Sequence, residues 1–479
     1  VDDMLVKVQT ITVFLVFCVT CLLFFSLWRK MSFENRKLPP GPVPFPILGN
    51  LLQLNTKNLS RDIEELSRMY GPVFTIYLGS ERVVVLSGYK TVKKALIGFG
   101  DEFSRRGSMP TLPPFIPLLF PFPGILRQFV LSTLRNFGMG KRSIEERIQE
   151  ETCFLVERFR NTHAFAPFLF LTHAVSNIIC SIVFGDRFDC EDKKFVTLIR
   201  LIEENGSLQR SHWILLYNFF PTLMDYLPGP HQQIFKNFEA FRRFVQERVK
   251  IHKETLDPNC PHDFIDAFLI KMEEEKYGHS KFNEESLAGS TMDLFVGGTE
   301  STSSTLKFGL LILLKYPEIE EKVHEEIDRV IGRSTCMADR SQMPYTDAVV
   351  HEIQRFISLV PFGVPRAVTG DVRLNQYIIP KGTTIFPFLK SVLYDSTEFP
   401  SPEQFNPGHF LDENGAFFYR MCVGESLARV EIFLILTTIL QNFILKPVID
   451  PKDIDITPVM SFVTDTPKPG DSRSLACLA

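Results

Sequence analysis

The stretch that decides the fold lies near the C-terminal end and reads Phe417-Phe418-Tyr419-Arg420-Met421-Cys422-Val423-Gly424-Glu425-Ser426-Leu427-Ala428-Arg429. It places one cysteine ahead of an apolar helical pattern, with an arginine two residues before it and a glycine two residues after it. A helix N-terminus favours a thiolate over a thiol, and a thiolate can ligate haem iron. Arg420 would then hold a haem propionate, and Gly424 would let the backbone approach the macrocycle. The alternative is a small buried apolar side chain, which a lone cysteine before a helix usually is.

Length, charge and cysteine usage exclude several classes of protein. A chain of 479 residues can bury a large core in roughly one to three domains. The formal net charge of -4 at pH 7 gives no indication of a nucleic-acid partner. The nine cysteines are scattered and odd in number, which indicates a reducing compartment rather than a disulfide framework. No dinucleotide-binding fingerprint occurs in the sequence, so electrons for redox chemistry must come from another protein.

An N-terminal stretch has the composition of a membrane anchor. Residues 8–28 carry no charged side chain, and as a helix they would span about 30 Å, the thickness of a bilayer core. Basic residues follow this stretch, and it is not followed by a small-residue cleavage site. This pattern favours an uncleaved single-pass anchor over a signal peptide. We expect residues 29–50 to form a basic stop-transfer flank and a proline-rich hinge, and residues 51–479 to form a cytoplasmic domain.

The remaining pattern predicts a mainly helical domain with a minor β portion. Residues 73–86 contain two β-prone runs around Gly79-Ser80, which predicts a hairpin. Residues 143–272 are mostly amphipathic and helical in texture, and residues 283–315 form one long helical pattern that ends before a proline. Residues 371–387 have the texture of short strands and turns.

The long helical pattern carries the most unusual chemistry at Gly297, Gly298, Glu300 and Ser301. Two adjacent glycines inside a helix cost about 1 kcal/mol each relative to alanine, so an offsetting role is expected. A ligand pressed against the backbone would supply that role, and the acid and hydroxyl that follow can relay protons to bound dioxygen. The alternative is a helix crossing that needs small residues.

A second pair of charged residues lies on another predicted helix. In His351-Glu352-Ile353-Gln354-Arg355, the acid and the arginine are one turn apart. The alternative is a surface ion pair, and such a pair contributes about a few tenths of a kcal/mol to stability. The stretch is not a zinc-protease motif, because Arg355 stands where the second histidine is needed.

These features occur in one order, from the anchor and the proline hinge through the glycine-bearing helix and Glu-x-x-Arg to Cys422. In that order the chain resembles the cytochrome P-450 superfamily of haem-thiolate monooxygenases. The resemblance is strongest to the microsomal family 2 and, within it, to the C subfamily. The most telling stretches are residues 133–151, 344–356 and 426–443.

The resemblance implies a role for each candidate residue. Cys422 looks like the axial iron ligand of haem b (iron protoporphyrin IX). Glu300 and Ser301 look like the acid–alcohol pair for proton delivery, with Gly297 and Gly298 making room for oxygen. Glu352 and Arg355, with residues 406–410, look like the network that shapes the cysteine loop. The arginines where the family places propionate partners are Arg106, Arg127, Arg366 and Arg420.

The resemblance also implies the fold, the reaction and the partners. The fold would be that of a cytochrome P-450 behind an N-terminal transmembrane helix, in the endoplasmic reticulum membrane. The enzyme would hydroxylate or epoxidise a lipophilic substrate such as a xenobiotic, a steroid or a fatty acid like arachidonate. Electrons would come from NADPH–cytochrome P-450 reductase, with cytochrome b5 as a further partner.

Three stretches depart from the family pattern. Before Cys422, Gly415 stands at a phenylalanine position and Phe418 at a glycine position, and the loop is shorter than usual. Residues 110–123 are rich in proline, and Pro123 replaces a tryptophan. The tail from residue 464 to 479 lacks the expected strand pattern. These departures suggest misjoined exons or a decaying gene copy, and hence an alternative reading as a catalytically silent or mis-spliced relative.

Overall fold

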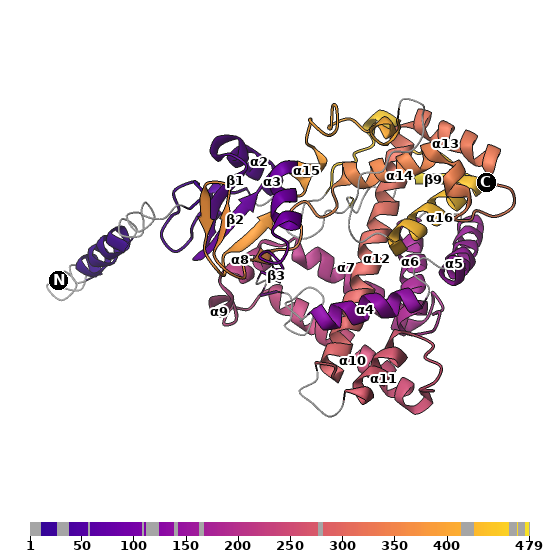
Figure 1. Cartoon of the computed structure of the whole chain (residues 1–479), viewed down its shortest axis with the longest axis horizontal. Helices are drawn as coiled ribbons and strands as arrows, with labels where there is room; N and C mark the ends of the chain where they lie inside the picture. Colours follow the sequence, from indigo (N-terminus) through magenta and orange to yellow (C-terminus); the bar gives the residue numbers. More distant parts are fainter. Residues whose placement is uncertain are drawn as a thin grey trace, which may run out of the picture. The chain divides into compact units, whose positions relative to one another are not determined.

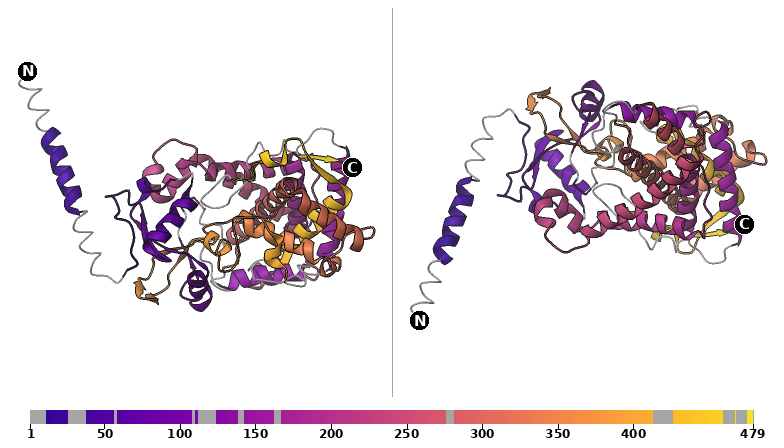
Figure 2. Two further views of the ribbon diagram at one scale, coloured as in Figure 1. Left: turned by 90° about the horizontal axis from the view of Figure 1, so that it is seen from above. Right: turned by 90° about the horizontal axis from the view of Figure 1, so that it is seen from below.

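The computed structural model describes most of the chain (Figure 1). The chain forms two compact units. The described residues are 11–25, 38–55, 58–107, 110–111, 124–137, 142–161, 167–275, 281–412, 426–458, 467 and 475–478. The first unit comprises residues 1–110, 216–226 and 361–392, and the second comprises residues 111–215, 227–360 and 393–479. Figure 2 shows the same ribbon from two further sides.

The first unit is built on a five-stranded sheet. Its hairpin confirms the one predicted at residues 73–86, and Gly79 in the turn has a φ of 62°, which favours glycine. β2 pairs in parallel with β7, and the other neighbouring strands pair antiparallel. In spatial order the strands are β1 (Val73–Leu78), β2 (Glu81–Leu86), β7 (Thr384–Pro387), β4 (Arg366–Ala367) and β3 (Arg105–Arg106).

Apolar side chains from distant parts of the sequence form the core of this unit. Val84 and Leu86 of β2 pack with Phe103 and Ile385, all of them buried. The strand texture predicted for residues 371–387 is confirmed by β5, β6 and β7. The other elements of the unit are η1 (Leu51–Gln53), α2 (Leu59–Tyr70), α3 (Tyr89–Lys93), η2 (Lys94–Gly98), α9 (Pro221–Met224), β5 (Val372–Leu374) and β6 (Tyr377–Ile379).

The proline-rich segment is attached to the edge of the sheet. The Thr75 backbone N–H donates to the Pro40 carbonyl at 2.7 Å, and the Thr75 hydroxyl donates to the Pro39 carbonyl at 2.9 Å. A Cβ at Gly41 would lie 1.8 Å from the Thr75 carbonyl oxygen, so only glycine permits this approach. Part of the predicted hinge is therefore fixed to β1.

The second unit is helical, and this confirms the predicted mainly helical class with a small sheet portion. Its helices are α4 (Gly124–Asn136), α5 (Arg142–Asn161), α6 (Pro167–Val183), α7 (Lys193–Gln209), α10 (His231–Thr255), α11 (Phe264–Glu274), α12 (Glu284–Lys315), α13 (Pro317–Val330), η3 (Asp339–Gln342), α14 (Pro344–Ile357), η4 (Pro407–Phe410), α16 (Ser426–Asn442) and η5 (Pro451–Asp453). Two helices cross a unit boundary in the sequence, namely α8 (His212–Phe219) and α15 (Lys390–Leu393).

The 32-residue helix α12 is the central element of this unit (Figure 1). It contacts α6, α10, α14 and α16, and most of its side chains are buried, because it is apolar around much of its circumference. Asn283 and Ser286 form a capping box at its start, and Pro317 begins the next helix after its end. The predicted boundaries of residues 283–315 are therefore confirmed.

Two of the predictions from the sequence concern the ends of the chain. Residues 11–25 are helical and expose apolar side chains, but residues 8–10 and 26–28 of the predicted anchor lie outside the described part. Among described residues, no helix is both long and apolar enough to cross a membrane. In the tail, β9 (Leu475–Leu478) pairs antiparallel with β8 (Ile444–Pro447), so the prediction that the tail lacks a strand is wrong. A four-residue apolar run was too short to be predicted as a strand without its partner.

Candidate functional site

The two glycines of α12 have different surroundings. A Cβ at Gly298 would lie 2.6 Å from Cδ1 of Ile179, so this glycine permits the close crossing of α12 and α6. A Cβ at Gly297 would meet nothing within 4 Å, and Gly297 is exposed on a helix that is otherwise mostly buried. The packing explanation therefore holds for Gly298, while Gly297 leaves open space against the helix backbone.

Ser301 lies one turn after Gly297, at the same accessible part of α12. Its hydroxyl donates to the Gly297 carbonyl oxygen at 2.7 Å. This bond uses the hydroxyl proton and leaves the oxygen lone pairs free to accept, since a hydroxyl carries one donor and two acceptor sites. The turn from Gly297 to Ser301 thus presents a hydroxyl oxygen beside open space, which is where a small ligand can approach the helix.

The side chain of Glu300 has different neighbours from that of Ser301. A Cβ at Gly206 on α7 would lie 3.1 Å from Glu300 Oε1, which places this carboxyl against the C-terminal turn of α7. Burial lowers the pKa of Arg210, and the charge of Glu300 opposes that shift. The predicted acid and alcohol are neighbours in the sequence. The acid, however, interacts electrostatically with Arg210 at the C-terminal end of α7.

Sequence reasoning missed Glu431 on α16. This carboxyl is 1% exposed, and burial raises its pKa to about 8 although the Thr302 hydroxyl donates to it. Within the part of the chain that the structure describes, Oε1 of Glu431 has no hydrogen-bond partner. Burial thus favours the neutral form of Glu431, which joins α16 to α12 through its hydrogen bond with Thr302. Its signal in the sequence is a single acid inside the apolar run of residues 430–436.

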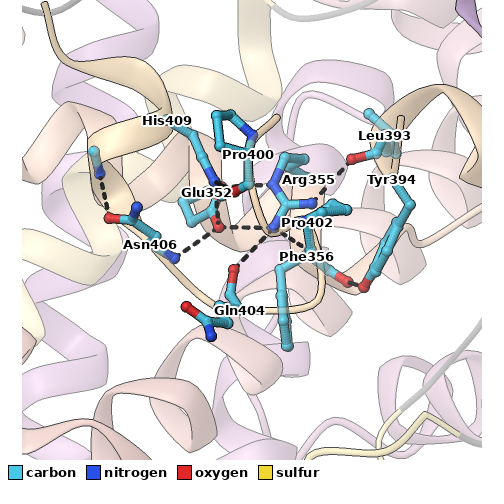
Figure 3. Close-up of polar contacts among 11 residues, drawn as sticks. Glu352, Arg355, Phe356, Leu393, Tyr394, Pro400, Pro402, Gln404, Asn406 and His409 are labelled. Carbon is cyan, nitrogen blue, oxygen red and sulfur yellow. Dashed lines mark hydrogen bonds and ion pairs between the residues drawn. The ribbon is translucent and has the colours of Figure 1, made fainter. Parts of the chain in front are cut away.

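Glu352 and Arg355 form a buried pair, so the surface alternative is wrong. Arg355 Nε donates to Glu352 Oε2 at 2.7 Å and Nη2 donates to Oε1 at 2.8 Å (Figure 3). The side chains are 1% and 0% exposed. A bidentate pair of this kind fixes both planes as well as both charges.

The same two side chains hold a segment that we define as the strap, residues 393–412 (Figure 3). Arg355 donates to the carbonyls of Leu393 at 2.9 Å, Pro402 at 2.9 Å and Gln404 at 3.3 Å. Glu352 Oε1 accepts from the Asn406 backbone N–H at 2.9 Å and lies 3.1 Å from His409 Nδ1. These contacts fix the strap to α14 from Leu393 to His409.

The predicted propionate partners fall into separate groups. Arg106 and Arg366 are direct cross-strand neighbours on β3 and β4, and Arg366 also donates to the Phe103 carbonyl at 3.1 Å. Arg127 lies on α4 in the other unit and is exposed. Cys422 and Arg420 lie outside the described residues, as do Gly415, Phe418, residues 112–123 and Phe462.

Comparison with known proteins decides the family. The cytochrome P450 family model matches residues 39–470. The chain belongs to the cytochrome P450 family. This cytochrome P450 is 56% identical to cytochrome P450 2H1 of Gallus gallus over 483 residues, which covers 96% of this chain and 97% of the relative. It is 53% identical to cytochrome P450 2C55 of Mus musculus over 467 residues, covering 93% and 95%. It is 52% identical to cytochrome P450 2C8 of Homo sapiens over 481 residues, covering 95% and 97%.

These relatives confirm the recognition of family 2. Membership supports a monooxygenase with a haem-iron cofactor, which is the coarse form of the sequence prediction. In the second unit, the open space that Gly297 leaves beside the Ser301 hydroxyl fits such a group.

Proposed function

We propose that this cytochrome P450 inserts one oxygen atom of O2 into a lipophilic substrate. In the balanced reaction, RH, O2, two protons and two electrons give ROH and water, or the corresponding epoxide for an alkene. The observation that carries the proposal is the accessible turn from Gly297 to Ser301 in an otherwise buried helix. The proposed substrates are xenobiotics, steroids and fatty acids such as arachidonate, as the resemblance to family 2 implies.

The cofactor in this proposal is haem b, which when bound supplies the redox chemistry of oxygen insertion. Cys422 would ligate the iron through its thiolate, and Arg420, Arg106, Arg366 and Arg127 would hold the propionates. The cross-strand arginine pair on β3 and β4 supports the assignment of Arg106 and Arg366.

The chain's own residues hold and orient protons around the oxygen site. Ser301 is fixed by its bond to Gly297, so its oxygen keeps one orientation toward the open space. Glu300 is an acid one residue away, and its carboxyl lies beside Gly206 of α7. Removing the Ser301 hydroxyl should therefore disturb proton delivery more than it disturbs folding.

The proposal includes the location of the protein in the cell. Residues 8–28 would anchor the chain in the endoplasmic reticulum membrane, with the domain in the cytoplasm. Exposed apolar side chains along residues 11–25, such as Phe14, Phe17 and Phe24, support this anchor. The electron donors would be NADPH–cytochrome P-450 reductase and cytochrome b5.

A second candidate is a catalytically silent or mis-spliced cytochrome P450. The departures at Gly415, Phe418 and Pro123 favour it, because they alter the residues around the expected ligand. Transcript sequencing separates a processing error from a genuine coding sequence. An mRNA that encodes these same junctions would exclude mis-splicing.

Turnover by the reconstituted full-length chain tests the main proposal. The chain is combined with reductase and lipid, and NADPH consumption, O2 consumption and oxygenated product are measured with a panel of lipophilic substrates. The proposal expects product that depends on all three components. Absence of product from every substrate, with the protein folded and the reductase active, favours the silent candidate.

A further inference from the structure

Arg210 stands at the C-terminal end of α7, and its side chain turns back along the helix. A Cβ at Gly206, one turn earlier, would lie 3.9 Å from Nη1 of Arg210. Arg210 is half-buried, yet its guanidinium makes no hydrogen bond or ion pair with the residues that the structure describes. A guanidinium carries five N–H donors, and withdrawing them from water without an acceptor costs free energy.

The carboxyl of Glu300 lies beside the same glycine, and its charge faces two cations. Its Oε1 would lie 3.1 Å from a Cβ at Gly206. Burial lowers the pKa of Arg210 and also that of Lys307, about two turns further along α12, and the charge of Glu300 opposes both shifts. The second acid that interacts with Lys307 is Glu203, which is exposed, so water screens its charge. One carboxylate therefore faces two half-buried cations, and the donors of Arg210 remain unused.

Arg210 reaches the accessible side of α12. Glu300 follows Gly297 by three residues, so the two residues share a face of the helix. Gly297 is exposed, and a Cβ there would meet no atom within 4 Å. The missing side chain of Gly206 leaves room for the guanidinium on this face. A cation with unused donors thus lies on the side of α12 that is open to a small molecule.

Buried amides hold this turn of α7 in place. The side chain of Asn237 on α10 donates to Oδ1 of Asn205 at 3.0 Å, and Gln233 donates to Asn237 at 2.9 Å. Asn205 immediately precedes Gly206. The turn is therefore tied to α10, and the guanidinium is positioned before a ligand arrives, which lowers the entropic cost of binding.

We propose that Arg210 binds the carboxylate of an acidic lipophilic substrate and thereby selects such acids over their esters. A planar guanidinium matches a carboxylate through two parallel hydrogen bonds, and the anion stabilises a cation that burial disfavours. The apolar remainder of the substrate extends to the space beside Gly297 and Ser301. The inference rests on the proposed function and narrows its substrates, because it takes this space as the place where the substrate lies.

Equilibrium binding to the full-length protein tests this inference without turnover. Dodecanoic acid and its methyl ester are titrated by calorimetry in one detergent at about pH 7.5, where a carboxyl group is ionised. The wild type should bind the acid more tightly than the ester by roughly tenfold or more, since hydrogen bonds between charged groups are worth that much. Arg210→Gln should abolish this preference by weakening the acid alone, and Arg210→Lys should keep part of it, because lysine keeps the charge.

Arg200→Gln is the matched control, because Arg200 is an exposed arginine of the same helix. It should leave the preference unchanged. Glu300→Gln should increase the preference, since this acid competes with the substrate for the guanidinium. A wild type that binds acid and ester equally, or an Arg210→Gln variant that still prefers the acid, would overturn the inference.

If the Arg210 variants do not fold, Glu300→Gln decides, since an increased preference supports the inference and any other result overturns it. Turnover separates this inference from the proposed function. Oxygenated product from acid and ester alike, in the wild type and in Arg210→Gln, would refute the inference alone. Absence of product from every substrate, with the acid preference intact, would refute the proposed function and leave the contact with Arg210 standing.

Discussion

The Ser301 hydroxyl donates a hydrogen bond of 2.7 Å to the carbonyl oxygen of Gly297, at the turn where α12 becomes accessible. Ser301→Ala should therefore uncouple the reaction, with product per NADPH falling by roughly a hundredfold or more, since a positioned proton-transfer group contributes about 10²–10⁴-fold. Ser301→Thr should restore coupling, because it returns the hydroxyl. The ratio of product to NADPH consumed measures this.

A matched control comes from the next turn. The Thr305 hydroxyl donates to the Ser301 carbonyl at 2.9 Å, but Thr305 is buried. Thr305→Val removes the same kind of helix bond and should leave coupling unchanged. Equal uncoupling in both variants would show that helix geometry matters and the Ser301 hydroxyl does not.

The two glycines should respond differently to alanine. Gly298→Ala should lower the free energy of unfolding by about 1–3 kcal/mol, because its Cβ would press on Ile179 of α6. Gly297→Ala should keep or raise the stability, by up to about 1 kcal/mol of helix propensity, because its Cβ meets no atom. Denaturant unfolding measures both, and equal effects would contradict the different surroundings.

Glu431 should make the stability fall with rising pH. Burial raises its pKa from 4.5 to about 8, so the folded state keeps a proton that the unfolded state releases. The free energy of unfolding should decline from about pH 4.5 to about pH 8 by a few kcal/mol, at ~1.4 kcal/mol per pKa unit. Glu431→Gln should remove this decline, and a protonated-carboxyl infrared band should vanish with it. A band that survives in the variant belongs to another acid.

The stability that His252 contributes should also fall as the pH rises. Histidine gains a positive charge on protonation, whereas Glu431 loses a negative one. Burial lowers its pKa, but the hydrogen bond and charge of Asp263 outweigh burial and raise it above 6.5. The folded state therefore gains stability below pH 6.5, which is lost as the pH rises through the raised value. Thermal unfolding of Asp263→Asn between pH 5 and 9 should show this component gone. An unchanged slope would contradict the pairing.

Arg355→Lys should destabilise the fold although it keeps the charge. Lysine cannot reproduce the bidentate bond to Glu352 together with the carbonyl contacts to the strap. The loss should be about 3–5 kcal/mol, as for a broken buried pair. Arg61→Lys in the exposed pair with Glu65 should change stability by less than about 1 kcal/mol.

Local pattern predicted much of the fold. The hairpin, the limits of α12 and the mainly helical class followed from turn residues, an apolar periodicity and a terminal proline. The strand β9 could not be predicted, because four apolar residues acquire a strand conformation only by pairing with β8, about thirty residues earlier.

The sequence predicted the residue types of the candidate site, but it did not predict which neighbours each residue contacts. Adjacent glycines predicted an unusual helix, but only the neighbouring α6 shows that Gly298 is a packing residue and Gly297 is not. Glu352 and Arg355 at a three-residue spacing fit a surface pair as well as a buried one, and burial depends on the strap. Glu431 was missed because its partner, Thr302, lies on a helix far away in the sequence.

The most direct test of the account is the carbon monoxide difference spectrum of the reduced full-length protein. Thiolate ligation by Cys422 predicts the red-shifted Soret band typical of the family, and Cys422→Ala should abolish the band while circular dichroism shows the fold intact. A folded wild-type chain without that band, or a band that persists in Cys422→Ala, would contradict the central claim.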